Sequence, residues 1–116
     1  MGMYHSTYFG YGIRIPVEGP PWQEAERLEE ELKKLKDQCP DVGYLQAGNY
    51  DADMTFLVTT SDEIELGTYK FVSPETHSAE HLADWDRQLA AAIDALGYCE
   101  KVGGASPGWL CVPDLS

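Results

Sequence analysis

Basic residues are scarce in this 116-residue chain: 8 Lys and Arg stand against 20 Asp and Glu, and the formal net charge is -12 at pH 7. Nucleic acids and anionic membranes attract proteins through Lys and Arg, so we expect direct binding to neither. The hydrophobic fraction of 43% and the charged fraction of 24% are ordinary for a globular protein, which argues against disorder. The imbalance therefore favours basic partners, cations or solubility alone.

Cysteine pairs and long apolar runs are also missing. Cys39, Cys99 and Cys111 show no C-x-x-C spacing, so the sequence predicts neither a disulfide framework nor a zinc knuckle. We expect buried thiols and a reducing, cytoplasmic setting. The longest strongly apolar stretch, residues 54–58, is too short to span a bilayer, and no secretion signal is expected.

Hydrophobic periodicity predicts one α+β domain over residues 1–116. Alternation with a period of two indicates a first strand over residues 4–15, and apolar spacings of three and four indicate amphipathic helices over residues 25–39 and 82–96. Further strands are expected at residues 42–47, 54–60, 64–72, 98–102 and 109–112. Short connections make the sheet mainly antiparallel, with two amphipathic helices packed on it in the order β-α-β-β-β-α-β(-β).

Capping residues predict where the helices begin and end. Pro21 suits a first helical turn, and Pro40 closes the first helix. Either Thr76 or Ser78 can cap the start of the second helix, and Gly97 suits the position after its end.

One short motif suggests metal chemistry. Residues 77–81 (HSAEH) match the inverted zinc-protease pattern, in which two imidazoles bind zinc and a glutamate activates water. Such a site needs a third ligand and a cleft, and the first histidine falls at or before the expected helix start. Surface or capping histidines are therefore favoured, and no cofactor is expected.

Two other motifs are incomplete. Residues 49–53 alternate oxygen-bearing side chains as a calcium loop begins, but Met54 stands where the sharp-turn glycine belongs, which favours a hairpin turn. Gly10 and Gly12 have the spacing with which a nucleotide-binding motif begins, but the third glycine and the following helix of that motif are missing. A bulge or tight helix packing is therefore favoured at these glycines.

Acidic side chains concentrate in one part of the sequence. No basic residue lies between Lys36 and Lys70, while acids fall there at expected turns and strand ends. They predict a negative patch, with aromatic rings suited to an interface beside it. The predicted acidic binding residues are Asp51, Asp53, Asp62, Glu63 and Glu65, and the predicted aromatic ones are Tyr8, Tyr44 and Tyr50.

The aromatic first strand at residues 8–16 (YFGYGIRIP), followed by residues 39–44 (CPDVGY), resembles the small uncharacterised acidic proteins of actinobacterial phages and prophages. The resemblance covers the first half of the chain and implies a phage-encoded accessory protein in the host cytoplasm. Many proteins of that kind bind and inhibit a host factor, including restriction or CRISPR effectors. The resemblance carries over no functional residue.

These features favour a non-enzymatic protein that docks a negative and aromatic surface on a basic host protein. A nucleic-acid-binding effector fits, because carboxylates can imitate duplex phosphates in its Lys/Arg groove. Two alternatives stay open. One is a small metal-binding protein or hydrolase using His77, Glu80 and His81, and the other is a homodimeric module that pairs through the aromatic first strand.

Overall fold

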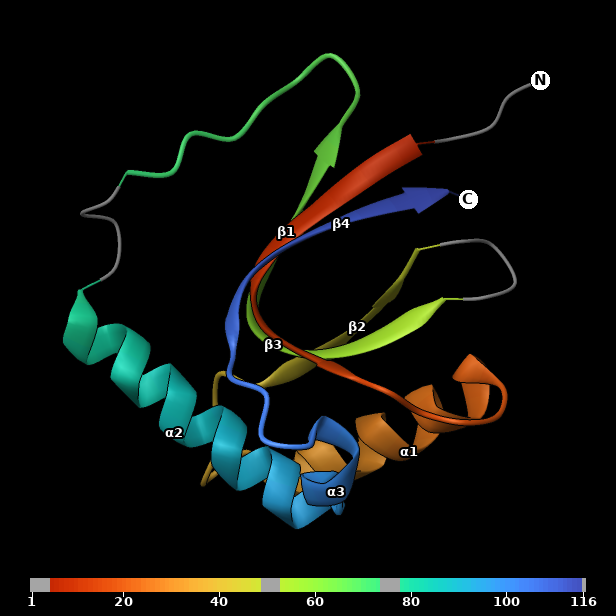
Figure 1. Cartoon of the computed structure of the whole chain (residues 1–116), viewed down its shortest axis with the longest axis vertical. Helices are drawn as coiled ribbons and strands as arrows, with labels where there is room; N and C mark the ends of the chain where they lie inside the picture. Colours follow the sequence, from red (N-terminus) through yellow and green to blue (C-terminus); the bar gives the residue numbers. More distant parts are fainter. Residues whose placement is uncertain (1–4, 49–52, 74–77, 116) are drawn as a thin grey trace.

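One antiparallel sheet with helices on one face makes up the fold, in a computed structural model that describes residues 5–48, 53–73 and 78–115 (Figure 1). The strand order is β2-β3-β1-β4, which confirms the predicted α+β class. The elements are β1 (His5–Ile15), α1 (Pro21–Lys34), β2 (Gly43–Ala47), β3 (Met54–Glu65), α2 (Ala79–Leu96), α3 (Cys99–Val102) and β4 (Gly108–Leu115).

Both predicted amphipathic helices form. Three of the predicted capping residues lie at helix ends, but α1 ends at Lys34, so the prediction that Pro40 closes it is wrong. Pro21 is the first residue of α1. At the start of α2, the Ser78 hydroxyl accepts a hydrogen bond from the His81 backbone N–H at 3.1 Å. Gly97 ends α2 with a φ of 78°, a left-handed conformation that glycine adopts without penalty. Among the described residues, no helix is long and apolar enough to cross a membrane.

Two of the predicted strands are wrong. Residues 64–72 do not form a separate strand, because β3 continues to Glu65 and then turns. Gly67 has a φ of 84° in that turn, and the Thr68 backbone N–H donates to the Glu65 carbonyl at 3.1 Å. The predicted strand at residues 98–102 is instead the short helix α3, followed by Gly103 with a φ of 59°.

The main core lies between the sheet and the helices. Side chains of β1 at Tyr11, Ile13 and Ile15 pack with Leu28 of α1 and Leu89 of α2, all nearly or completely buried. These β1 residues share the face that period-two alternation predicted for them. We call this the helix face of the sheet, and the opposite one the concave face.

The sheet curls because β1 approaches β3 very closely at two glycines. A Cβ atom at Gly12 would lie 2.0 Å from the Leu57 carbonyl oxygen, and one at Gly10 would lie 2.2 Å from the Thr60 carbonyl oxygen. The register between the strands shifts between Tyr11 and Gly12, which confirms the expected bulge. The glycines thus accommodate β3 backbone, whereas the alternative of tight helix packing is wrong.

A second, smaller core lies on the concave face. The curl brings the two edge strands, β2 and β4, into contact (Figure 1). The Gly48 backbone N–H, just after β2, donates to the Asp114 carboxylate of β4 at 2.9 Å. Buried side chains from three strands fill the curl: Ala47, Phe56, Val58 and Val112. The sheet therefore covers most of its own second face.

Candidate functional site

A bulge in β3 decides which way its acidic side chains point. Tyr11 lies opposite Thr60, whereas Gly12 lies opposite Val58, so Thr59 is an extra residue in β3. One extra residue reverses the faces of all side chains beyond it. Asp62, opposite Phe9, therefore lies on the helix face, while Glu63, opposite Tyr8, lies on the concave face.

The charges of three carboxylates act on Tyr8, and we call them the acidic cluster: Asp53, Glu63 and Asp114. Glu63 and Asp114 lie on the concave face with Tyr8, and Asp53 directly precedes β3. The Ser6 hydroxyl donates to the Glu63 carboxylate at 2.7 Å. Burial raises the pKa of the Tyr8 hydroxyl above its ordinary value, and the charges of Glu63, Asp114 and Asp53 raise it further. The tyrosine therefore stays neutral and offers a hydrogen-bond donor inside a negative site.

Asp53 gives this cluster a measurable pH dependence. Burial and the charge of Asp114 raise the pKa of Asp53, so the folded state holds its proton more tightly than the unfolded chain does. Ionised Asp53 therefore destabilises the fold. The loss in the free energy of unfolding grows as pH rises from about 4, the ordinary aspartate pKa. We expect Asp53→Asn to raise the free energy of unfolding at pH 7 by under about 1 kcal/mol, since water screens a partly exposed pair.

Urea unfolding between pH 3 and pH 7 measures this effect as a flatter pH profile for Asp53→Asn. Asp37→Asn is the control, because it removes the same charge from an exposed position after α1. A gain that is as large for Asp37→Asn as for Asp53→Asn would show that only the overall net charge matters.

Aromatic rings form a continuous row on the helix face. Trp109 of β4 stacks on Phe9 with ring centres 5.3 Å apart and meets Tyr11 edge-on at 5.1 Å. Tyr11 in turn contacts Trp85 of α2 at 5.6 Å. The Tyr11 hydroxyl donates to Asp86 at 2.6 Å, and burial together with this bond raises its pKa to about 12. One end of the row is thus fixed in the core.

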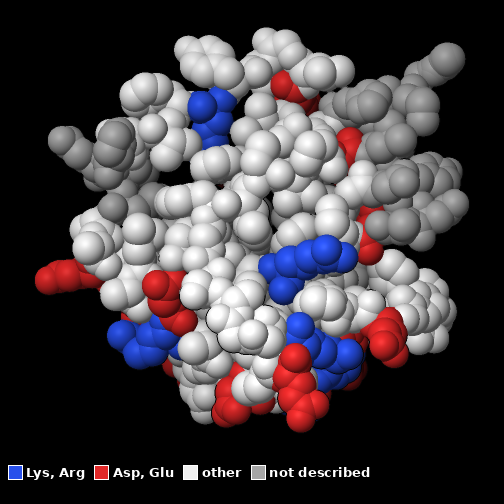
Figure 2. Space-filling view, in the orientation of Figure 1, with Lys and Arg blue, Asp and Glu red and all other residues white. Residues whose placement is uncertain are grey.

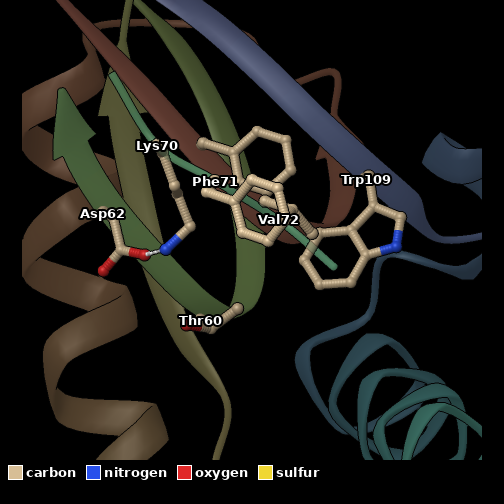
Figure 3. A pocket seen from close by; sticks show the side chains of 7 residues that line it. Thr60, Asp62, Lys70, Phe71, Val72 and Trp109 are labelled. Atoms are coloured by element: carbon tan, nitrogen blue, oxygen red, sulfur yellow. Dashed lines mark hydrogen bonds and ion pairs between the residues drawn. The ribbon is translucent and has the colours of Figure 1, made fainter. Parts of the chain in front are cut away.

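At the other end of the row, Phe9 and Trp109 line a cavity together with side chains of residues 66–73. We call this segment, which follows β3 in Figure 1, the strap. Lys70 of the strap forms an ion pair with Asp62, which holds the strap beside the sheet (Figure 3). A cavity of about 70 Å³ lies between strap and sheet. It is lined by Phe9, Thr60, Asp62, Lys70, Phe71, Val72 and Trp109.

The strap exposes large apolar side chains to an unusual degree. Tyr69 is 87% exposed, Phe71 81% and Leu66 78%. Trp109 is 40% exposed and lines the same cavity as Phe71. We call Phe9, Tyr69, Phe71 and Trp109 the aromatic surface. Contiguous exposed apolar side chains of this kind mark interaction sites.

The predicted site residues divide between several places. Asp53, Glu63 and Tyr8 come together in the acidic cluster. Asp62 lies on the other face in its pair with Lys70, and Glu65 is exposed at the end of β3.

Tyr44 lies apart from these residues, on the helix face, where its hydroxyl donates to Glu29 of α1 at 3.1 Å. Burial and this bond raise the pKa of Tyr44, as expected for a ring used in packing. The predicted residues Tyr50 and Asp51 lie outside the described residues.

Charged groups in the orientation of Figure 1 gather over the helices at the lower end of the molecule, where both signs are mixed (Figure 2). The upper part of that view is mostly uncharged, with separate carboxylates and a basic group among them. On this face the acids therefore do not merge into one continuous negative field. In the acidic cluster, by contrast, the charges of three described acids act on one side chain, Tyr8.

Sequence reasoning missed Asp114, Tyr69 and Phe71. Asp114 joins the acidic cluster because β4 pairs with β1, which sets it opposite Ser6. The strap residues carried a signal of another kind, since their aromatic and β-branched side chains fitted the strand predicted over residues 64–72.

The alternative metal site gains no support among the described residues, in which no three His, Cys, Asp or Glu side chains are placed so that they could hold a metal ion. His77 lies outside them. Glu80 and His81 are exposed in the first turn of α2, and the His81 ring packs 4.3 Å from that of Trp85.

Cysteine burial follows the prediction at one position of three. Cys39 is buried and its thiol contacts the Gln88 carbonyl at 3.4 Å. Cys99 and Cys111 are exposed, so the expectation of buried thiols is wrong for both. Cys99 lies in α3 and Cys111 in β4.

The homodimer alternative needs a revised geometry. β1 is bonded to β3 on one side and to β4 on the other, so its backbone is not available to a second copy. Pairing through the first strand is therefore limited to side-chain contacts.

Comparison with known proteins finds one partial likeness. Over 70 residues, covering 60% of this chain, the sequence is 36% identical to a threonylcarbamoyl-AMP synthase of Pyrococcus abyssi. The match spans 21% of that enzyme, so the likeness does not establish a family. No family model matches the chain, and no solved structure matches it significantly.

Proposed function

We propose that this protein is a non-enzymatic binding protein that docks its acidic cluster and aromatic surface on a basic protein partner. The observation that carries the proposal is the placement of the two surfaces. Tyr8 and Phe9 are consecutive in β1 and point to opposite faces, so Glu63 and Asp114 of the acidic cluster lie on one side of this end of the sheet, and Phe9 and Trp109 of the aromatic surface lie on the other. A partner that binds this end of the sheet contacts both surfaces.

The chemistry of the two surfaces indicates how each contributes. Carboxylates attract a basic protein over a long range and align it, while large aromatic rings supply most of the contact energy once water is expelled. A nucleic-acid-binding host effector presents a Lys/Arg groove suited to such carboxylates, and the resemblance to phage proteins favours a defence effector. The protein then acts as an inhibitor, because it occupies the groove.

Capture from a host lysate tests the proposal. The immobilised protein is expected to retain one dominant basic protein, which about 0.5 M NaCl releases by screening. The neutralised variant Asp53→Asn/Glu63→Gln/Asp114→Asn is expected to lose capture. A control with the same charge change on exposed helix positions, Glu26→Gln/Glu30→Gln/Asp94→Asn, is expected to keep it.

Equal capture by both variants, or no capture at any salt concentration, would contradict the proposed function. Inhibition is measured separately, as displacement of a labelled DNA or RNA duplex from the recovered partner. A partner that binds the duplex and this protein at the same time would rule out the nucleic-acid mimic.

A further inference from the structure

The backbone of the strap is extended and unpaired over four residues. Residues 69–72 have no regular secondary structure. No hydrogen bond among the described residues joins their backbone groups to the rest of the chain, and their one polar contact is the Lys70 side chain on Asp62. A row of free N–H and C=O groups on an extended segment is a template for pairing with another strand.

The side chains of this segment are those of a β-strand. Tyr69, Phe71 and Val72 are aromatic or β-branched, the residue types that pleated sheets favour. Tyr69 and Phe71 are two positions apart and are the two most exposed apolar side chains of the described residues. A segment with such strand character usually pairs with a neighbouring strand, and the strap pairs with no strand of the described chain.

The charges around the strap indicate the charge of its partner. Asp62, Glu63 and Glu65 precede it, all exposed, while Lys70 is its single basic residue and is paired with Asp62. A second copy of this chain would bring these carboxylates together with their own counterparts, and the net charge of -12 opposes that approach. A strand with basic flanking side chains fits instead.

We propose that residues 69–72 form a docking strand that adds, by backbone hydrogen bonds, to an exposed strand of a basic partner. Backbone pairing supplies affinity, and the two exposed rings together with the flanking carboxylates select the partner. The proposal rests on the proposed function for the partner's charge and adds the mode of contact. Ion pairing with Asp62 keeps the strand close to the sheet and lowers the entropy lost on docking.

A synthetic peptide of alternating Lys and Val is the probe. Titration into the ¹⁵N-labelled protein is expected to shift the amide signals of residues 69–72 and to slow their hydrogen exchange. The same peptide methylated at every backbone nitrogen keeps its charge and loses its donors, so it is expected to bind at least about tenfold more weakly. An alternating Glu and Val peptide is expected not to bind.

Proline substitutions test the strap itself. Successive residues of a strand direct their N–H groups to opposite edges, so one of Phe71→Pro and Val72→Pro removes a docking bond and the other does not. We expect one of these variants to bind the peptide at least about tenfold more weakly. Trp22→Ala is the control, because it removes an aromatic ring that is 60% exposed, in α1.

Each alternative result overturns the docking strand in a distinct way. Equal binding of the methylated peptide means that charge alone holds the probe, and no binding of any peptide means that the strap does not pair. A dimer in light scattering that either proline variant disrupts makes a second copy the occupant. Lysate capture that survives both proline variants but not neutralisation of the acidic cluster rejects the docking strand while leaving the proposed function intact.

Discussion

Gly12→Ala is expected to lower the free energy of unfolding by at least about 3 kcal/mol, a large share of the stability of a small domain. The added Cβ atom would lie 2.0 Å from the Leu57 carbonyl oxygen and 2.8 Å from the Val58 Cα atom. Both are backbone atoms of β3, so no side-chain rotation relieves the overlap. β1 would have to move away from β3, which opens the curl that encloses the second core.

The measurement is chemical unfolding followed by tryptophan fluorescence, with Gly43→Ala as the matched control. Gly43 also lies in a strand, yet a Cβ atom there meets nothing within 4 Å. Its replacement is expected to change the free energy of unfolding by no more than about 0.5 kcal/mol. Similar losses for the two variants would mean that glycine acts through strand propensity and not through close approach.

The elements of this fold were predictable where local signals decide the structure. Period-two alternation gave the faces of β1 correctly, and Pro21, Ser78 and Gly97 mark helix ends as expected. The strap was not predictable, because residues 69–72 carry strong strand character that no neighbouring strand uses. A local pattern reports what a segment favours, and it cannot report whether the sheet has a place for it.

The candidate site depended on register, which sequence alone does not provide. Glu63 was expected in an acidic patch and lies in the acidic cluster, but Asp62 points the other way because Thr59 is an extra residue in β3. Asp114 enters the cluster only because β4 pairs with β1. Long-range strand pairing therefore decides which acids converge, and composition predicts only that acids are available.

The two tryptophans of the aromatic row are expected to respond differently to replacement. Trp85 is 6% exposed and joins α2 to the sheet through Tyr11, so Trp85→Ala leaves a cavity in the main core. We expect a loss of about 3–5 kcal/mol in the free energy of unfolding. Trp109 is 40% exposed, and its replacement removes two ring contacts, with an expected loss of about 1–2 kcal/mol.

For binding of the partner, we expect the larger effect from replacing Trp109 and the smaller effect from replacing Trp85. Trp109→Ala removes a ring of the aromatic surface, so capture of the basic partner is expected to fall at least about tenfold, as for a hot-spot residue. Trp85 is a buried residue of α2, and Trp85→Ala should bind normally at temperatures where it stays folded. Stability and capture measured on the same preparations separate the two roles. Loss of capture that merely follows loss of stability would place the docking site elsewhere, because the exposed end of the aromatic row would then contribute nothing of its own.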